Sequence, residues 1–392
     1  MKKTLIALAV LTVSSASFAQ STVTLSGVLD VGVRNTSKVA AGAAKLGVTA
    51  GNNARLVFGV AEDLGGGMKA LANAQMRFDP TTGTAEVGGA RPLFQGETRV
   101  GLSAGFGTVM LGRGLTALQL ANGGNSDPWG VTTAAGSVYA AGFATDYAAG
   151  GEGRIDQAVF YTSPRFGGLT LSASMSPRKI VTAEVTGVTA VPASANLTTG
   201  VVTPAVAGVT ATAAGVSKTS QSINLVYANG PLVIGVGNER NRANDTITQV
   251  YANYNLGVAK VFASSATIKG GSAEEQRFGG TFAAAASAVN TGTTANRQVA
   301  AGGKIENWTV GATVPMGAAT IRVGYSGWNG SGAAGQLDDT KFGLGVKYDL
   351  SKRTFIYTDV ATQTRKNLTG TAAAGRDNTN VQLFDLGVAH SF

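Results

Sequence analysis

The sequence predicts an all-β protein, a transmembrane antiparallel β-barrel of about sixteen strands. Three observations predict it. Polar and apolar side chains alternate along short segments, short turns interleave with longer irregular stretches, and the last strand ends on an aromatic residue. A short positive and apolar segment at residues 1–19 resembles an export signal with cleavage after Ala19, which leaves one domain over residues 20–392.

Alternation with a period of two is the main secondary-structure signal. It runs through residues 22–34, 168–176, 320–326 and 341–348. In the first of these segments Leu25, Leu29 and Val33 fall on one face of a strand, whereas Asp30 and Arg34 fall on the other. Such a pattern indicates strands with one apolar and one polar face.

The spacing of turns separates a membrane barrel from a soluble sandwich. Seven short segments rich in Gly, Pro, Asn or Asp lie at 62–68, 103–107, 164–168, 229–231, 255–257, 315–318 and 349–352. Eight longer stretches interleave with them, at 35–52, 79–93, 114–153, 177–219, 240–246, 266–305, 327–340 and 362–380. This asymmetry is typical of outer-membrane barrels, which have short periplasmic turns and long external loops.

Charge and composition exclude several functions. Without the two signal lysines, 29 basic residues face 22 acidic ones, a net charge of +7. The basic residues form no run and the chain is exported, which argues against nucleic acid as a partner and favours a channel that attracts anions. The chain has no cysteine and a single histidine, His390. Catalytic residues, a metal site and a cofactor are therefore not expected.

The C-terminal segment carries a second membrane signal. Phe384, Leu386, Val388, His390 and Phe392 share one face of a final strand. This arrangement resembles the terminal signal by which outer-membrane barrels are delivered to the barrel-assembly machinery.

Motifs along the whole mature chain resemble the general porins of Gram-negative bacteria, in particular the β-proteobacterial, anion-preferring type. The motifs are TVTLSGVLD at 22–30, EDLGGGMKA at 62–70, VGLS at 100–103, FGTV at 106–109, LGR at 111–113, YTSPRFGG at 161–168, YNLGVA at 254–259, LSKRT at 350–354 and HSF at 390–392. The resemblance implies a homotrimer in the outer membrane, in contact with lipid and lipopolysaccharide. It also implies a passive channel for small hydrophilic solutes, narrowed by the third external loop folded into the lumen.

Alternation and this resemblance together predict the residues of the constriction. By parity the polar face carries Arg55, Arg77, Arg99, Glu97 and Arg154, whereas Arg113 breaks the parity of its strand and is assigned from the LGR motif, where alternation is expected to end. Loop three contains no Lys or Arg, and its acids are Asp127, Asp146 and Glu152. Asp127 matches the acidic loop site that faces the wall arginines in this family, but Asp before Pro also initiates turns.

One departure from the family concerns the strength of anion preference. Relatives place a base at or next to position 96 or 97, where this chain has Gly96 and Glu97. Pairing of Glu97 with a neighbouring arginine is expected to soften the positive constriction. Two other functions stay open, a substrate-specific channel and a structural or adhesive barrel. The first needs aromatic side chains along the lumen, whereas several aromatic residues here have outward parity.

Overall fold

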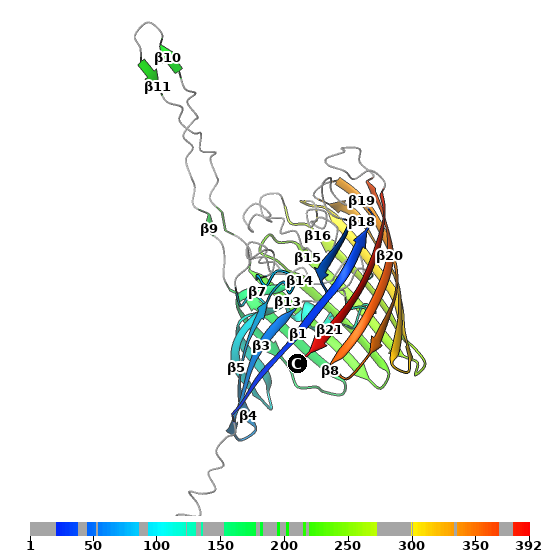
Figure 1. Ribbon diagram of the computed structural model, residues 1–392. Coiled ribbons are helices and arrows are strands. Elements are labelled where there is room, and N and C mark those ends of the chain that lie inside the picture. Colours follow the sequence, from blue (N-terminus) through cyan, green and yellow to red (C-terminus); the bar gives the residue numbers. More distant parts are fainter. Residues whose placement is uncertain are drawn as a thin grey trace, which may run out of the picture.

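The computed structural model describes most of the mature chain. The described residues are 21–37, 45–51, 54–85, 93–122, 124–130, 135, 153–177, 181–182, 194–196, 201–203, 215–216, 219–272, 299, 301–332, 335–367 and 379–392. They form a closed antiparallel β-barrel (Figure 1). The expected signal segment, residues 1–19, lies outside the described residues.

The barrel wall has sixteen strands, as the sequence predicts. Its elements are β1 (Thr22–Thr36), β2 (Leu46–Ala50), β3 (Arg55–Gly65), β4 (Met68–Arg77), β5 (Glu97–Ala104), β6 (Gly107–Leu115), β7 (Arg154–Thr162), β8 (Leu169–Ser176), β13 (Ser220–Asn229), β14 (Leu232–Arg240), β15 (Thr246–Asn255), β16 (Lys260–Lys269), β17 (Lys304–Met316), β18 (Ala319–Gly332), β19 (Gly335–Asp349), β20 (Thr354–Asn367) and β21 (Thr379–Ser391). The short β2 and the longer β3 pair with successive halves of β1, so they act as one interrupted strand. Strand β21 also pairs with β1 and closes the barrel, which leaves no strand edge unpaired in the membrane.

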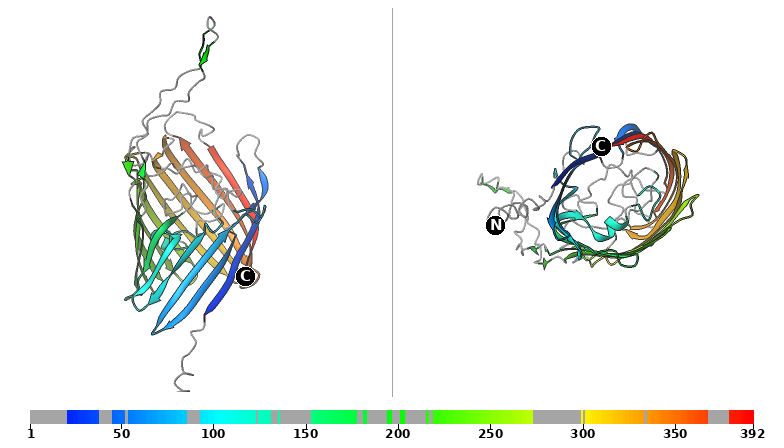
Figure 2. Two further views of the ribbon diagram at one scale, coloured as in Figure 1. Left: turned by 90° about the vertical axis from the view of Figure 1, so that its left-hand side faces the viewer. Right: turned by 90° about the horizontal axis from the view of Figure 1, so that it is seen from below.

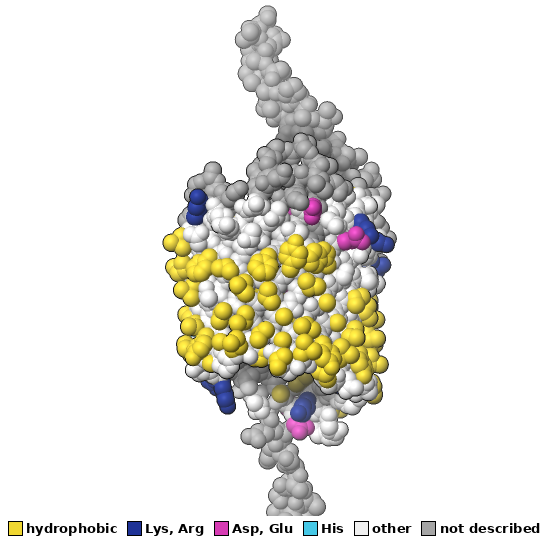
Figure 3. All heavy atoms as spheres, turned by 90° about the vertical axis from the view of Figure 1, so that its right-hand side faces the viewer, with side chains coloured by type: hydrophobic (Ala, Val, Ile, Leu, Met, Phe, Trp, Pro, Cys, Tyr) yellow, Lys and Arg dark blue, Asp and Glu magenta, His cyan; other side chains and the backbone are white. Residues whose placement is uncertain are grey.

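The alternation in the sequence becomes the two faces of the wall. In β1, Leu25 and Leu29 point outward with 59% and 43% of their surface exposed, whereas Asp30 and Arg34 point into the barrel with 2% and 6% exposed. On the face shown in Figure 3, apolar side chains form a belt across the barrel, with charged side chains near its two margins. The polar face of each strand therefore lines the lumen.

The connections confirm the seven short turns and correct some loop lengths. Short turns join β3 to β4, β5 to β6, β7 to β8, β13 to β14, β15 to β16, β17 to β18 and β19 to β20. The stretch 327–340, expected to be a loop, is mostly strand, because β18 and β19 stay paired up to Gly332 and Gly335. Its Gly, Asn and Asp residues resemble loop composition, yet a neighbouring strand satisfies their backbone groups as it would those of any residue.

Two further features lie in the connections. The stretch between β8 and β13 contains two short ribbons, β9 (Val181–Thr182) with β12 (Gly215–Val216) and β10 (Ser194–Asn196) with β11 (Val201–Thr203). Loop three, which joins β6 to β7, contains helix α2 (Ala117–Asn122). That helix lies inside the ring of strands (Figure 2, right). No helix among the described residues has the length and apolarity to cross a membrane.

Candidate functional site

Three arginines on strands β3 to β5 form one charged patch of the lumen, here called the arginine wall: Arg55, Arg77 and Arg99. Arg55 and Arg77 stand directly opposite each other on β3 and β4. Arg77 is buried, with 4% exposed, and Arg55 is half-buried. The charge of Arg55 interacts with both Arg77 and Glu97. Like charges in facing positions repel each other, so a nearby carboxylate stabilises the pair.

Glu97 is that carboxylate, and it is bound by neighbouring side chains of β4 and β5. Glu97 Oε2 lies 2.5 Å from Arg99 Nη2 and accepts a hydrogen bond of 3.0 Å from Asn73 Nδ2. The guanidinium carbon of Arg99 also lies 5.3 Å from the ring centroid of Phe160. The structure thus pairs Glu97 with Arg99, so one of the three positive charges of the wall is compensated.

Arg113 lies near the loop end of strand β6, at an irregular point of the wall where the register with β7 shifts between Gly112 and Gly114. Strand β6 runs on to Leu115, and Arg113 stands opposite Thr98, whose side chain is exposed on the outer face. Its guanidinium forms an ion pair with Asp156. The pairing with β5 ends at this position, and Gly112 beside it has a φ of 131°. The pairing partner places Arg113 on the outer parity, and the ion pair leaves only 15% of its side chain exposed, so Arg113 is bound to Asp156 and is not part of the arginine wall.

The parity argument for Arg154 is also wrong. It assigned Ile155 and Val159 to one face, yet Ile155 is buried with 1% exposed while Val159 points outward with 41% exposed. The register between β6 and β7 shifts here, and Gln157 has a φ of 50°. An extra residue in a strand reverses the alternation beyond it. Counting from Val159 consequently does not locate Arg154, which is half-buried at the start of β7.

Loop three is attached first to strands β8 and β13. The backbone nitrogens of Ala117 and Leu118, at the start of α2, donate hydrogen bonds of 3.1 Å and 3.0 Å to the hydroxyls of Ser174 and Ser222. These hydroxyls satisfy two of the donors that a helix start leaves free. Leu118 then packs with luminal side chains of β15, β16 and β17 in a buried cluster that also contains Ile247, Tyr251, Ala266, Ile268, Val299 and Ile305.

The tip of loop three crosses to the opposite side of the barrel. Asp127 is buried with 3% exposed, and its Oδ1 accepts a hydrogen bond of 2.7 Å from the backbone nitrogen of Trp129. This contact is the turn chemistry that Asp before Pro favours. Trp129 Nε1 in turn donates a hydrogen bond of 2.7 Å to Asp359 Oδ1 on β20. The charge of Asp127 interacts with Arg322 of β18. The tip is therefore held against the wall opposite the arginine wall. Asp146 and Glu152 lie outside the described residues.

Three glycines in register make room for this tip, and we call them the glycine row: Gly311, Gly324 and Gly343 on β17, β18 and β19. A Cβ on Gly311 would lie 2.5 Å from Pro128, and one on Gly324 would lie 2.7 Å from Trp129. A Cβ on Gly343 would meet Ala135. Real Cβ atoms do not approach this closely, so the loop can lie against the wall only because these positions lack side chains.

The wall behind the tip carries charged residues that the candidate set omits. Arg322, Asp359, Asp385 and Arg34 lie along one row of β18, β20, β21 and β1, with Gly345 of β19 between the first two. Arg34 Nη2 lies 3.0 Å from Asp385 Oδ2. On the neighbouring positions Tyr357 donates a hydrogen bond of 2.8 Å to Asp30. The sequence carried this signal, because Asp385 alternates with Phe384 and Leu386.

The inventory of luminal acids therefore needs correction. The sequence places Asp30 and Glu97 on the polar face of their strands and Asp127 in loop three, beside five candidate arginines. Further buried acids among the described residues are Glu239, Asp245, Asp339, Asp359 and Asp385. The positive character of the lumen thus depends on where charges lie, and not on a simple excess of arginine.

The described residues offer little for catalysis. They contain no group of three or more His, Cys, Asp or Glu side chains that could hold a metal ion. His390 is exposed on the outer parity of β21, and its Nδ1 lies 2.9 Å from Thr354 Oγ1. A closed wall, a polar lumen and an inward loop define a narrowed aqueous path, and such a path can conduct solutes.

Comparison with known proteins identifies the family. The sequence profile of the Gram-negative porins matches residues 4–368. The chain belongs to the Gram-negative porin family. This porin is 27% identical to outer membrane porin protein 32 of Delftia acidovorans, with all of both chains covered. It is an outer-membrane channel, and porins are known as channels rather than enzymes.

Solved porin structures share the fold. The anion-selective porin from Comamonas acidovorans aligns with a TM-score of 0.68 and 22% identity, over 95% of this porin and 100% of that chain. The trimer form of OmpT from Vibrio cholerae aligns with a TM-score of 0.58 and 11% identity, over 95% and 99% of the two chains.

Proposed function

We propose that this porin conducts small hydrophilic solutes passively and prefers anions weakly, and that the arginine wall is the selectivity element. The observation that carries the proposal is that loop three and the arginine wall lie on different parts of the lumen wall. Described parts of loop three contact β8, β13, β15, β17, β18, β19 and β20. These described contacts lie on strands other than β3 and β4, and we infer that permeating ions pass the side of the lumen that carries Arg55 and Arg77.

The local charge balance sets the sign and the weakness of the preference. The arginine wall holds three positive charges and one carboxylate, Glu97. On the opposite side Asp359 and Asp385 lie in a row that ends on Arg322 and Arg34, so these acids are compensated. Low-dielectric walls focus the potential of this arginine cluster and raise the local concentration of anions. The name of the Comamonas acidovorans relative, an anion-selective porin, agrees with this sign.

Reversal potentials across a planar bilayer with a salt gradient test the proposal. Wild type should give an anion-preferring potential at about 0.1 M salt that declines towards 1 M, as the Debye length falls from about 10 Å to about 3 Å. The double variant Arg55→Gln, Arg77→Gln should shift the potential toward cations. Arg353→Gln, in the exposed turn after β19, is the matched control and should leave it unchanged. A cation-preferring wild type, or a double variant equal to the control, would overturn the proposal.

We also infer that the porin assembles as a homotrimer in contact with lipid and lipopolysaccharide. The ion pair of Arg113 and Asp156 supports a contact between copies. It lies on the outer parity near the loop ends of β6 and β7, and charged side chains on the lipid face of a barrel are unfavourable. Cross-linking in native membranes tests the assembly. Recovery of monomer alone would contradict it.

Export and assembly signals complete the proposal. We infer that residues 1–19 are removed after Ala19, and that the strand ending in Phe392 is recognised by the barrel-assembly machinery. The outward row of Phe384, Leu386, Val388 and His390 on β21 supports the second inference. Mass spectrometry of the mature protein tests the first, and an N-terminus other than residue 20 would contradict it.

A further inference from the structure

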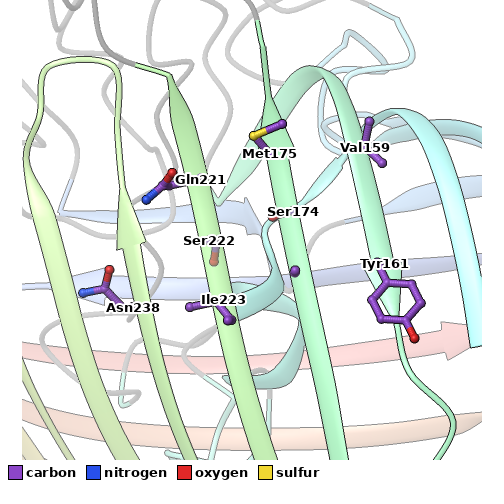
Figure 4. Close-up of a pocket in the computed structure, with 9 residues that line it drawn as sticks. Val159, Tyr161, Ser174, Met175, Gln221, Ser222, Ile223 and Asn238 are labelled. Atoms are coloured by element: carbon purple, nitrogen blue, oxygen red, sulfur yellow. The ribbon is translucent and has the colours of Figure 1, made fainter.

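Three oxygen-bearing side chains on β8, β13 and β14 form a row beneath helix α2 of loop three, and we call it the anchor row: Ser174, Ser222 and Glu239. The three residues stand opposite one another in successive strand pairs, and Figure 4 shows Ser174 and Ser222 on their neighbouring strands. They are buried, with 4%, 4% and 2% of their surface exposed, whereas Met175 and Ile223 beside them are exposed on the outer face. The anchor row therefore belongs to the luminal side of the wall.

The anchor row contacts three successive residues of loop three. The two serine hydroxyls accept the hydrogen bonds from the backbone nitrogens of Ala117 and Leu118. Glu239, the third member, interacts with the hydroxyl of Thr116, the residue directly before α2. Thr116 is itself buried, with 1% exposed. The start of the loop thus depends on two neutral hydroxyls and one ionisable group.

The carboxyl of Glu239 is enclosed without a countercharge among the described residues. Both of its oxygens are buried, and neither accepts a hydrogen bond of ordinary geometry from a described residue. The groups that interact with it are the hydroxyls of Thr116 and Ser222, and both are neutral. An ionised carboxylate in such a place costs several kcal/mol, because no partner replaces the water that it loses.

The elements packed around Glu239 supply no opposite charge either. Strands β8 and β13 and helix α2 contain no charged residue. The ionisable groups on the other surrounding elements are Tyr251 of β15, Arg240 on the outer parity of β14, Arg242 and Asp245 of the connection from β14 to β15, and Arg154 of β7. None of these groups contributes to the interactions of Glu239, which burial outweighs.

The packing of α2 determines where the loop goes if Glu239 ionises. A Cβ on Gly237 of β14 would lie 2.5 Å from Leu118 Cδ1, so the helix lies directly on the wall. No space remains behind it, and α2 can leave the wall only toward the lumen. Water reaches the carboxyl of Glu239 by the same displacement.

We propose that Glu239 is the positioning residue for the start of loop three. As a neutral acid it holds Thr116 against the wall, and its ionisation displaces α2 into the lumen. The neutral form is favoured at low pH, so the seated loop is most stable there and is released as pH rises. The channel therefore closes more often at alkaline pH. The proposal requires a conducting channel and is independent of the ion preference proposed above.

Single-channel recording of the full chain in planar bilayers, from about pH 4 to about pH 10, tests the proposal. A salt concentration of about 1 M screens exposed charges. Wild type should close more often as pH rises, about tenfold per pH unit below the midpoint, as titration of one group requires. Glu239→Gln keeps the shape but cannot ionise, so at every pH it should behave like wild type at acid pH. Glu306→Gln, which removes an exposed carboxyl of β17, should keep the wild-type profile.

Infrared spectroscopy of the solubilised protein measures protonation separately from conductance. At neutral pH, Glu239→Gln should weaken the carbonyl band of protonated carboxylic acids, whereas Glu306→Gln should leave it unchanged. In wild type the band should decrease over the pH range in which closures increase. A wild-type channel whose closures do not change with pH, a Glu239→Gln channel with the wild-type profile, or a neutral-pH band that Glu239→Gln leaves unchanged would each overturn the proposal.

Discussion

The indole nitrogen of Trp129 donates a hydrogen bond of 2.7 Å to Asp359 Oδ1, and this bond links the tip of loop three to β20 on the opposite side of the barrel. Both residues are buried, with 6% and 1% of their surface exposed. Because loop three begins at β6, the loop has to cross the lumen to reach this contact. Together with the glycine row, this bond holds the tip of loop three against that wall.

Trp129→Phe should loosen that attachment without disturbing the barrel. The variant keeps an aromatic ring beside Gly324 but removes the donor to Asp359, and losing such a buried bond costs about 1–2 kcal/mol. Excursions of the tip should therefore become about tenfold more frequent. Single-channel recordings should show more current fluctuations and a larger cut-off for polyethylene glycol polymers.

The matched control is Trp308→Phe, which changes a tryptophan on the outer face of β17 that is 37% exposed. It should leave conductance and cut-off unchanged. If both variants conduct like wild type while folding normally, the Trp129 contact does not position the loop.

Adding one methyl group to the glycine row should displace the tip. In Gly324→Ala the new Cβ would lie 2.7 Å from Trp129, so the indole must move away from the wall. The tip would then intrude further into the lumen, and single-channel conductance should fall measurably. Gly47→Ala is the control, because a Cβ there meets nothing within 4 Å. Equal conductance of the two variants would show that the glycine row does not set the position of the tip.

The sequence predicts the strands of the barrel wall far better than the contacts of loop three inside the lumen. The facing of Leu25 or Asp30 follows from local alternation, which depends only on neighbours in the chain. The Trp129–Asp359 contact joins residues 230 positions apart, and no local pattern encodes it. The parity argument for Arg154 failed for a related reason, since the irregularity at Gln157 lies where the register of β6 and β7 shifts.

The role of Asp127 likewise depends on contacts that local sequence patterns do not encode. Two interpretations of this residue were open, a charge facing the arginines and a turn before Pro128. Burial and the bond to the Trp129 backbone now favour the turn. Composition of the loop alone could not decide, because it does not reveal on which side of the lumen the tip lies.

Asp127→Asn should therefore have a small effect on selectivity. Asparagine keeps an oxygen that can accept from the Trp129 backbone, so the turn should persist. The lost charge lies near Arg322 and away from the arginine wall. The reversal potential at about 0.1 M salt should move toward anions by less than the Arg55→Gln, Arg77→Gln variant moves it toward cations. A larger shift of the reversal potential would show that Asp127 is part of the selectivity element.

The C-terminal residue closes the barrel by pairing with the first strand. Phe392 O accepts from Gly27 N at 3.0 Å, and Phe392 N donates to Gly27 O at 3.1 Å. The Phe392 ring lies over Gly27, where a Cβ would come within 2.9 Å of Cε2. These two bonds contribute about 1–3 kcal/mol together, a small share of a wall in which every strand is paired.

Deleting Phe392 should consequently affect assembly in cells much more than stability. Purified chain lacking Phe392 should refold in detergent with nearly wild-type yield, measured by heat-modifiable migration in gels. In cells the same deletion should reduce the amount in the outer membrane several-fold, whereas Phe392→Tyr, which keeps an aromatic end, should remain close to wild type. Equal losses in cells and in detergent would show that Phe392 acts through barrel closure alone. Normal membrane levels of the deletion would contradict a role in recognition.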